Sequence, residues 1–267
     1  MNSAAFFASL RRRESGVFGT SLSQSQVQGI EAILDACDAA GATLSQTAYM
    51  LATPYGETGG KMQAVRENLN YSASSIAKHF GPHRRQGKTP QQLARNPRLL
   101  GNTVYGGPWG AKHLGNVGPN DGYDFRGFGI GQWTGRRNTE KAGRGVGLDL
   151  VANPALLDDI NVNAKLLVDW MMNGKATGKK LGDYVNADRQ DYRGARAVWG
   201  GVDATKYVGY AKAFEIALNA GGYSARPEIK PHVDAPKTPK AQEVPQAGGF
   251  SARIAAIFAM FTRKGKK

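Results

Sequence analysis

The sequence predicts a mainly α-helical fold in which one domain carries a loop-rich cleft and a short helix ends the chain. Apolar residues recur at helical spacing over much of the first 220 residues, whereas strand-like alternation is hard to find. Glycine, asparagine and aromatic residues gather between Gly101 and Gly147, a composition typical of irregular loops that line a site. Five prolines between Arg226 and Gln246 then precede a last apolar stretch. The 267 residues, 41% of them hydrophobic, suffice for one main domain and a small addition.

Start and stop signals predict the individual helices. The first 13 residues place their charges after the apolar run, whereas a secretory signal places them before it, so we expect an amphipathic helix and no signal peptide. Further helices are expected over residues 26–39, 44–53, 161–172 and 208–218. Thr43 and Gln46 have the spacing of a capping box. Pro54 and Gly56 are expected to disturb or end the helix that follows, which places Glu57 at its C-terminal edge.

Three segments are expected along the chain. Residues 1–222 form the main domain, and the proline-rich residues 223–249 form an extended linker that cannot bury enough surface to fold. Residues 250–267 combine one apolar helical face with a basic end. They are too short to span a bilayer but suit a helix that lies on an anionic membrane or outer membrane. The alternative is that they dock on the main domain as a last core helix.

Charge and cysteine content narrow the classes of partner. Lys and Arg number 35 against 21 acidic residues, a formal charge of +14, so we expect a polyanionic partner: nucleic acid, anionic lipid or bacterial cell wall. Nucleic acid is disfavoured, because zinc spacing, aromatic RNA-binding strands and a basic recognition helix are all missing from the sequence. The single cysteine, Cys37, excludes an intramolecular disulfide and is expected to be a buried structural thiol.

No metal and no cofactor is expected. His79 and His83 stand four residues apart, but no carboxylate completes a site and Pro82 interrupts the helix that would align them. The glycines at 127, 129 and 131 imitate a phosphate loop without the strand, helix and lysine that such a loop requires.

Two glutamates indicate the chemistry. Glu57 and Glu67 flank the pair Gly59 and Gly60, and hydrolysis of a glycosidic bond needs one carboxylic acid and a second polar group for water or for the transition state. A carboxyl group near a helix C-terminus in a partly apolar cleft is favoured in its protonated form, as a general acid requires. The spacing therefore indicates a glycosidase.

Several ordered motifs resemble the family-19 chitinase-like lysozymes, especially phage endolysins. The resemblance covers roughly residues 4 to 220, and its strongest blocks are residues 51–60, 67–73, 101–107 and 126–136. It implies a lysozyme-like helical domain of the family-19 chitinase type that hydrolyses β-1,4 glycosidic bonds. It also implies that Glu57 is the general acid.

Further site residues follow from the same resemblance. Glu67 is the candidate second carboxylate, acting as a base on water or as an electrostatic partner, and Thr134 completes the catalytic set. A separation of about 6.5 to 9.5 Å between the two carboxyl groups would favour inversion and about 5 to 5.5 Å retention; the resemblance implies inversion. Six residues are expected to contact substrate: Tyr71, Asn102, Tyr105, Arg126, Gln132 and Trp133.

Plainer interpretations of these residues stay open. Glu67 can be a capping or surface acid that pairs with Arg66 or Lys61. Gln132 and Thr134 can simply bond to nearby backbone, and the aromatic residues can simply pack.

The sequence departs from the family pattern at four positions. Gly56 stands where the family usually has histidine, Pro54 replaces a typical alanine, Phe128 replaces an arginine, and Gly200 replaces the asparagine of a late Asn-Gly pair. These departures call the rate and the affinity for substrate into question.

The resulting expectation is an endolysin-type peptidoglycan hydrolase, a muramidase, that acts as a monomer on the glycan strands of a bacterial wall. It would be made in the host cytoplasm and act on the wall in the periplasm after release, or be carried in the virion. One alternative is a chitinase, whose substrate shares the N-acetyl group and the β-1,4 link. Another, of a different class, is a virion or wall-binding structural protein with weakened catalysis.

Overall fold

A computed structural model describes residues 1–201 and 203–224 and confirms the predicted mainly helical fold. Within these residues no strand forms; the extended pairing consists of isolated bridges, of which Arg66 with Phe128 and Phe128 with Trp133 matter below. The helical elements are α1 (Ser3–Leu10), η1 (Arg13–Ser15), α2 (Gln24–Ala39), α3 (Leu44–Glu57), α4 (Ala73–His79), η2 (Pro82–Arg84), α5 (Pro90–Leu93), α6 (Pro97–Val104), α7 (Gly107–Leu114), α8 (Asp121–Asp124), α9 (Arg136–Val146), η3 (Pro154–Asp158), α10 (Ile160–Met172), η4 (Leu181–Asp183), α11 (Arg196–Trp199) and α12 (Ala204–Ala220).

The helices expected from apolar spacing are all present, and side-chain caps begin α2, α3 and α10. The capping box at Thr43 and Gln46 is confirmed at the start of α3. A second one, Ser23 with Gln26, begins α2 two residues earlier than expected. Each box supplies acceptors for backbone N–H groups that have no partner inside the helix.

The helix α3 continues further than expected. It runs through Pro54 and Gly56 and ends at Glu57, so the expected C-terminal edge at Glu57 is confirmed while the expected stop at residue 53 is wrong. Packing explains the difference, because α3 lies against α12 and buries most of its side chains. Burial on this scale outweighs the backbone hydrogen bond that a proline removes.

The expectation of irregular loops over residues 101–147 is wrong for most of that stretch, which contains the second half of α6 and all of α7, α8 and α9. The residues that resemble loop formers serve as helix ends. Asn96 caps α6 through its side chain, and Gly115 and Gly147 end α7 and α9 with φ of 71° and 72°. Residues 125–135 remain irregular, and they carry Arg126, Gln132 and Thr134.

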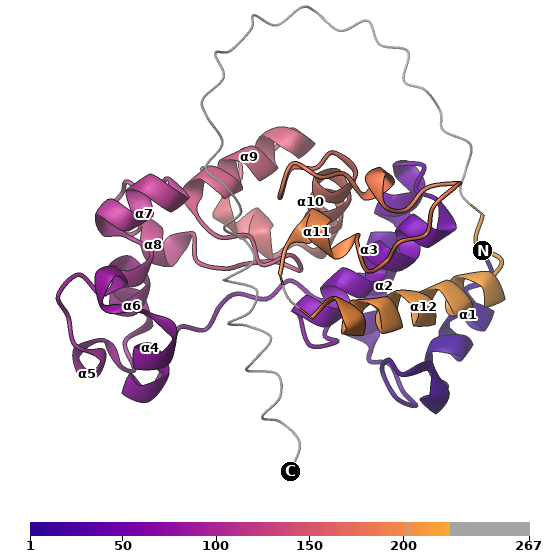
Figure 1. The fold of residues 1–267 in the computed structure, drawn as a ribbon, viewed down its shortest axis with the longest axis horizontal. Coiled ribbons are helices and arrows are strands. Elements are labelled where there is room, and N and C mark those ends of the chain that lie inside the picture. Colours follow the sequence, from indigo (N-terminus) through magenta and orange to yellow (C-terminus); the bar gives the residue numbers. More distant parts are fainter. Residues whose placement is uncertain (202, 225–267) are drawn as a thin grey trace, which may run out of the picture.

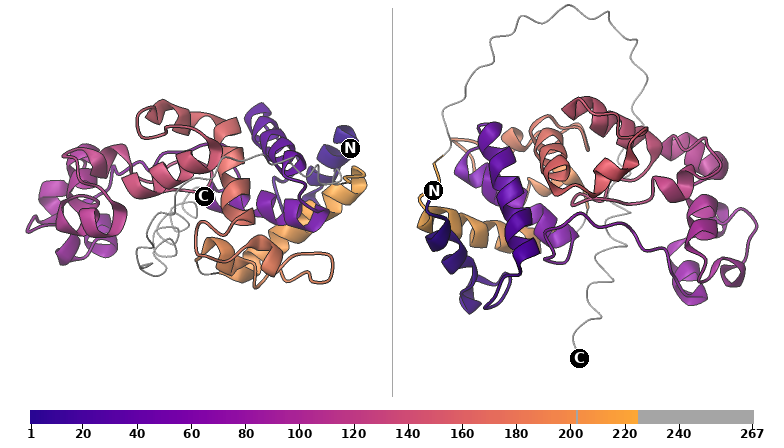
Figure 2. Two further views of the ribbon diagram at one scale, coloured as in Figure 1. Left: turned by 90° about the horizontal axis from the view of Figure 1, so that it is seen from above. Right: turned by 180° about the vertical axis from the view of Figure 1, so that it is seen from behind.

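Two hydrophobic clusters organise the molecule. The larger one joins side chains of α1, α2, α3, α10 and α12, and the smaller one gathers residues from Leu69 to Leu114, including Phe80 and Tyr105. Figure 1 shows the corresponding arrangement, with α4 to α8 at one end and α1, α2, α3 and α12 at the other, and both views in Figure 2 agree. The segment between α3 and α4 crosses from the larger group to the smaller one and carries Glu67.

Three further expectations concern single features. Cys37 is fully buried, as predicted. No helix in the described ranges is long and apolar enough to cross a membrane. The predicted linker (223–249) and final helix (250–267) lie, from residue 225 onward, outside the described residues.

Candidate active site

Glu57 lies at the end of α3 in a buried ion pair. Its side chain is almost fully enclosed, and Oε1 accepts hydrogen bonds from Arg196 Nη2 at 2.9 Å and from the Tyr207 hydroxyl at 2.8 Å. The guanidinium of Arg196 lies 3.9 Å from the centre of the Tyr207 ring. A charge-assisted contact of this kind stabilises a carboxylate and fixes its orientation. Glu57 is thus held by two elements that follow it by more than 130 residues.

Arg196 has unused hydrogen-bonding capacity. Its side chain is 5% exposed, and both Nε and Nη1 are buried with no partner among the described residues. Gly201 explains how the guanidinium fits, because a Cβ at that position would lie 2.5 Å from Nη2, and its φ of 108° also favours glycine. Gly200 has a φ of 81°. Gly201, which keeps the glycine of the family's Asn-Gly pair, therefore makes room for the arginine that contacts Glu57.

Glu67 occupies a different environment. It is 3% exposed, and Oε1 accepts hydrogen bonds from the hydroxyls of Tyr105 at 2.9 Å and Tyr71 at 3.2 Å. Its other oxygen, Oε2, is buried and has no partner among the described residues. Burial raises the pKa of Glu67 above its ordinary value, and the two tyrosine hydroxyls partly oppose that shift because they stabilise the ionised form.

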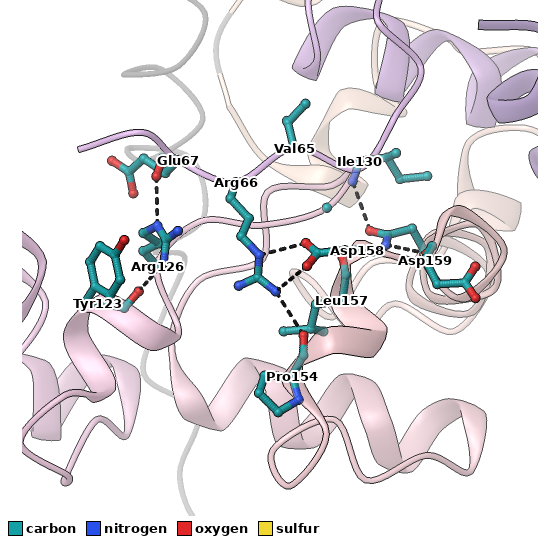
Figure 3. A network of polar contacts seen from close by, with 12 residues as sticks. Val65, Arg66, Glu67, Tyr123, Arg126, Ile130, Pro154, Leu157, Asp158 and Asp159 are labelled. Atoms are coloured by element: carbon teal, nitrogen blue, oxygen red, sulfur yellow. Dashed lines mark hydrogen bonds and ion pairs between the residues drawn. The ribbon is translucent and has the colours of Figure 1, made fainter. Parts of the chain in front are cut away.

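The alternative of Glu67 as a surface acid is wrong, because Glu67 is buried and the nearby arginine pairs elsewhere. Arg66 donates from Nε to Asp158 at 2.7 Å and from Nη2 to the Pro154 carbonyl at 2.9 Å. Figure 3 shows this contact beside the backbone of Glu67. The salt bridge anchors the crossing segment to η3.

Arg126 holds the same segment from the other side. Its Nε donates to the backbone carbonyl of Glu67 at 2.9 Å, and its Nη1 donates to the carbonyl of Tyr123 at 2.8 Å (Figure 3). The backbone N–H of Glu67 donates to the Gly127 carbonyl at 2.7 Å. Both polar groups of the Glu67 backbone are therefore fixed by the irregular stretch 125–135.

Arg84 supports the tyrosine that contacts Glu67. Its guanidinium lies 5.1, 5.1 and 4.1 Å from the ring centres of Phe80, Tyr105 and Trp109, and it donates from Nε and Nη2 to the carbonyl of Val104. Burial lowers the pKa of Arg84, and its charge opposes the pKa increase at Glu67. A guanidinium enclosed by aromatic rings restricts how Tyr105 can move.

Gln132 and Thr134 lie close to Glu67 but bond to backbone. The Gln132 Nε2 donates to the carbonyls of Val65 at 3.1 Å and Gly129 at 2.8 Å, and the Thr134 hydroxyl donates to the Gln132 carbonyl at 3.4 Å. A Cβ placed on Gly127 would lie within 3.5 Å of the side chains of Gln132, Glu67 and Thr134. The structure therefore gathers these three around Gly127, while the catalytic and substrate-binding roles remain predictions.

The other expected substrate contacts lie inside the fold. Tyr105 is fully buried and Tyr71 is 9% exposed, so each reaches the site through its hydroxyl and not through an open ring face. Trp133 packs in the larger cluster against Trp170, Trp199 and Phe128, which explains why phenylalanine at 128 is accommodated. The Asn102 amide accepts from the Tyr123 N–H at 2.8 Å and donates to Asn120.

The two histidines do not share a helix. His79 ends α4 and His83 lies in the separate turn η2. In the part of the chain that the structure describes, no group of three His, Cys, Asp or Glu side chains is arranged to hold a metal ion.

Two surface hollows lie away from the glutamates. One of about 460 Å³ is lined by α2 and α10, and one of about 590 Å³ follows α9 and the residues after it. Neither is lined by a residue of the predicted site. The candidate site is therefore identified from the contacts of its side chains and not from either of these hollows.

Sequence reasoning missed Arg196, Tyr207 and Arg84. Arg196 carried a signal, because it is a lone charge within the apolar stretch 195–199. A charge in such a position is rarely buried unless it is paired. Its partner, however, is 139 residues away in the chain.

Comparison with known proteins supports a relation to family 19. The chain is 33% identical over 107 residues to a glycosyl hydrolase family 19 domain-containing protein of Haemophilus influenzae. The match covers 39% of this chain, and the chain spans about half the length of that relative. No protein-family model matches the chain. The partial similarity agrees with the family that the ordered motifs resemble.

Proposed function

We propose that this protein is a glycoside hydrolase that cleaves the β-1,4 bonds of peptidoglycan as a muramidase, with Glu57 and Glu67 as its acid and base. The observation that carries the proposal is the pair of buried glutamates in unlike environments. One is paired with an arginine and the other is desolvated with one oxygen unbonded. Two carboxyl groups whose surroundings differ in this way are typical of glycosidases.

The motif resemblance assigns the roles. Glu57 protonates the leaving glycosidic oxygen, and Arg196 and Tyr207 then stabilise the carboxylate that remains. Glu67 accepts a proton from the attacking water at its unbonded Oε2, while Tyr71 and Tyr105 stabilise the ionised base through Oε1. Water attack opposite the leaving group gives inversion.

Arg196 pairs with Glu57 at 2.9 Å, and an arginine in this position would also suit Glu57 as the base. The order therefore needs its own test, separate from the test for activity.

The setting of the activity is part of the proposal. A charge of +14 favours retention on an anionic wall, and the resemblance to phage endolysins favours a role in host lysis. We propose that the protein is a monomer, that it is made in the host cytoplasm, and that it acts on the wall after release or from the virion.

Clearing of purified walls tests the activity. The wild-type protein should clear them, and Glu57→Gln and Glu67→Gln should each slow clearing by about 10² to 10⁴-fold, the usual share of general acid or base catalysis. A wild-type protein that binds walls and clears none would overturn the proposal in favour of a wall-binding structural protein. Mass spectrometry of the released glycan ends separates a muramidase from a glucosaminidase or a chitinase.

Chemical rescue tests the order of roles. If Glu57 is the acid, an aryl oligosaccharide whose leaving group needs no protonation should restore turnover to Glu57→Gln. If Glu67 is the base, azide, which needs no deprotonation, should restore turnover to Glu67→Gln. The reverse pattern would exchange the two roles and leave the glycosidase proposal intact.

A further inference from the structure

Two arginines share one tyrosine beside the candidate site. Tyr123 belongs to α8, Arg98 to α6, and Arg126 to the irregular stretch that follows α8. The guanidinium carbons lie 4.0 Å (Arg126) and 5.0 Å (Arg98) from the centre of the Tyr123 ring. Figure 3 shows Tyr123, Arg126 and Glu67 next to one another.

Arg126 is held in place but not neutralised. Two of its nitrogens donate to backbone carbonyls, whereas Nη2 donates to no acceptor in the described ranges. Its side chain is partly buried, and this burial lowers its pKa. Asp124 is close in the chain and exposed, yet it forms no ion pair with Arg126 within the described residues. The charges of Glu67 and Asp124 act on Arg126 without an ion pair, so its guanidinium keeps hydrogen-bonding capacity with which it can bind an anion.

Arg66 provides the contrast. It also lies beside Glu67, but Asp158 neutralises it through two hydrogen bonds of 2.7 and 3.2 Å. Arg98 is exposed and makes no ion pair with the carboxylates that the structure describes. Unneutralised charge therefore concentrates at Arg126 and Arg98, on the side of Glu67 where Tyr123 lies.

We infer that Arg126 and Arg98 form a subsite that binds a carboxylate of the substrate next to Glu67. The inference rests on the proposed function. A planar guanidinium binds a carboxylate through charge-assisted hydrogen bonds, and both arginines lie over the Tyr123 ring. Unmodified chitin carries no carboxylate. Peptidoglycan carries carboxylates on its stem peptides, and on the lactyl group of its muramyl sugar once the peptide is removed. The arginine pair therefore selects the anionic wall glycan over a neutral glycan of the same backbone.

Binding measurements test the subsite independently of turnover. The background is the full chain with Glu57→Gln, and the substitutions are Arg98→Gln, Arg126→Gln and Arg126→Lys, the last of which keeps the charge and removes the planar fork. Three glycans of equal length serve as probes: peptide-bearing wall glycan, peptide-stripped wall glycan with free lactyl carboxylates, and N-acetylglucosamine oligosaccharide. Arg137→Gln is the matched control, since Arg137 is exposed and its side chain bonds only to the carbonyl of Lys112 among the described residues.

The expected readout is the ratio of Kd for a carboxylate-bearing glycan to Kd for the neutral oligosaccharide. This ratio should rise about 2- to 5-fold for Arg98→Gln, as for a partly exposed ion pair. It should rise about tenfold or more for both Arg126 substitutions, as for a lost hydrogen bond to a charged group. Arg137→Gln should leave it unchanged. A rise with the peptide-bearing glycan alone identifies a stem carboxylate, and a rise with the stripped glycan as well identifies the lactyl carboxylate.

Equal weakening on all three glycans, no weakening on any, or a matching effect of Arg137→Gln would each overturn the subsite. Equal weakening would mean that Arg126 acts only through the backbone of Glu67. Failure of the proposed function is a separate observation, namely a wild-type protein that clears no wall. The Kd ratio is measured without turnover and therefore tests the subsite alone.

Discussion

Tyr207 fills the space beside Gly56. A Cβ at position 56 would lie 2.4 Å from Cε1 of the Tyr207 ring and 2.8 Å from its hydroxyl oxygen. That hydroxyl donates to Glu57. The glycine that stands where the resembled family has histidine therefore allows a tyrosine from α12 to reach the candidate acid.

Gly56→Ala should displace Tyr207 and disturb Glu57. Overpacking of a tight contact costs about 1 to 3 kcal/mol. For a chain of this size the melting temperature should fall by roughly 2 to 4 °C per kcal/mol. Wall clearing should fall as well. Gly209→Ala in α12 is the control, because a Cβ there meets no atom within 4 Å. Unchanged stability and clearing in Gly56→Ala would show that Tyr207 has room to move.

Tyr105→Phe should shift the pH dependence of kcat/KM. The hydroxyl stabilises ionised Glu67, so its removal raises the pKa of Glu67 further. A base must be ionised to act, and the acidic limb of the profile should therefore move to higher pH, with more activity lost at pH 5 than at pH 8. Tyr192→Phe is the control, since Tyr192 is also buried but its hydroxyl accepts a hydrogen bond from Gln190 and bonds to neither Glu57 nor Glu67. A limb that stays in place or moves to lower pH would contradict the base assignment.

Glu67→Gln should stabilise the protein near neutral pH. The pKa of Glu67 is raised in the folded state, so the folded protein holds this proton more tightly than the unfolded chain does. Stability from this group is present below the ordinary pKa of 4.5 and is lost as pH rises through the folded value. In thermal unfolding from pH 4 to 8, the melting temperature of the variant minus that of the wild type should increase as pH rises. A constant difference across that range would mean that Glu67 does not titrate in this window.

Deletion of residues 250–267 should weaken action on intact cells and spare action on purified peptidoglycan. The physical reason is the apolar residues and the basic end in the sequence of this segment, which favour contact with an anionic membrane. Clearing rates on the two substrates provide the comparison. Equal loss on both would indicate that the segment is part of the folded domain.

The sequence predicts local features of this protein well. The capping box at Thr43 and Gln46 and the position of Glu57 at a helix end depend on neighbours within a few residues. The prediction of loops over residues 101–147 was wrong for most of the stretch, because Asn and Gly are found at helix ends as well as in loops.

Contacts between residues far apart in the chain could not be predicted from the sequence. Tyr105 reaches Glu67 from 38 positions away, and Arg196 reaches Glu57 from 139. Tyr105 is among the residues expected to contact substrate, and its ring is buried while its hydroxyl donates to Glu67. Spacing along the chain says little about which atom of a side chain is used once packing sets its direction.

The partners of Glu57 are translated late in the synthesis of the chain. Arg196 and Tyr207 emerge from the ribosome long after α3, and the amide of Asn2 donates to the carbonyl of Gly221 at 2.7 Å, beyond the end of α12. A nascent or C-terminally truncated chain that stops before residue 196 therefore contains both glutamates without the groups that orient the first. Under the proposed function such a fragment would be inactive, and activity would begin only once nearly the whole helical domain had been translated.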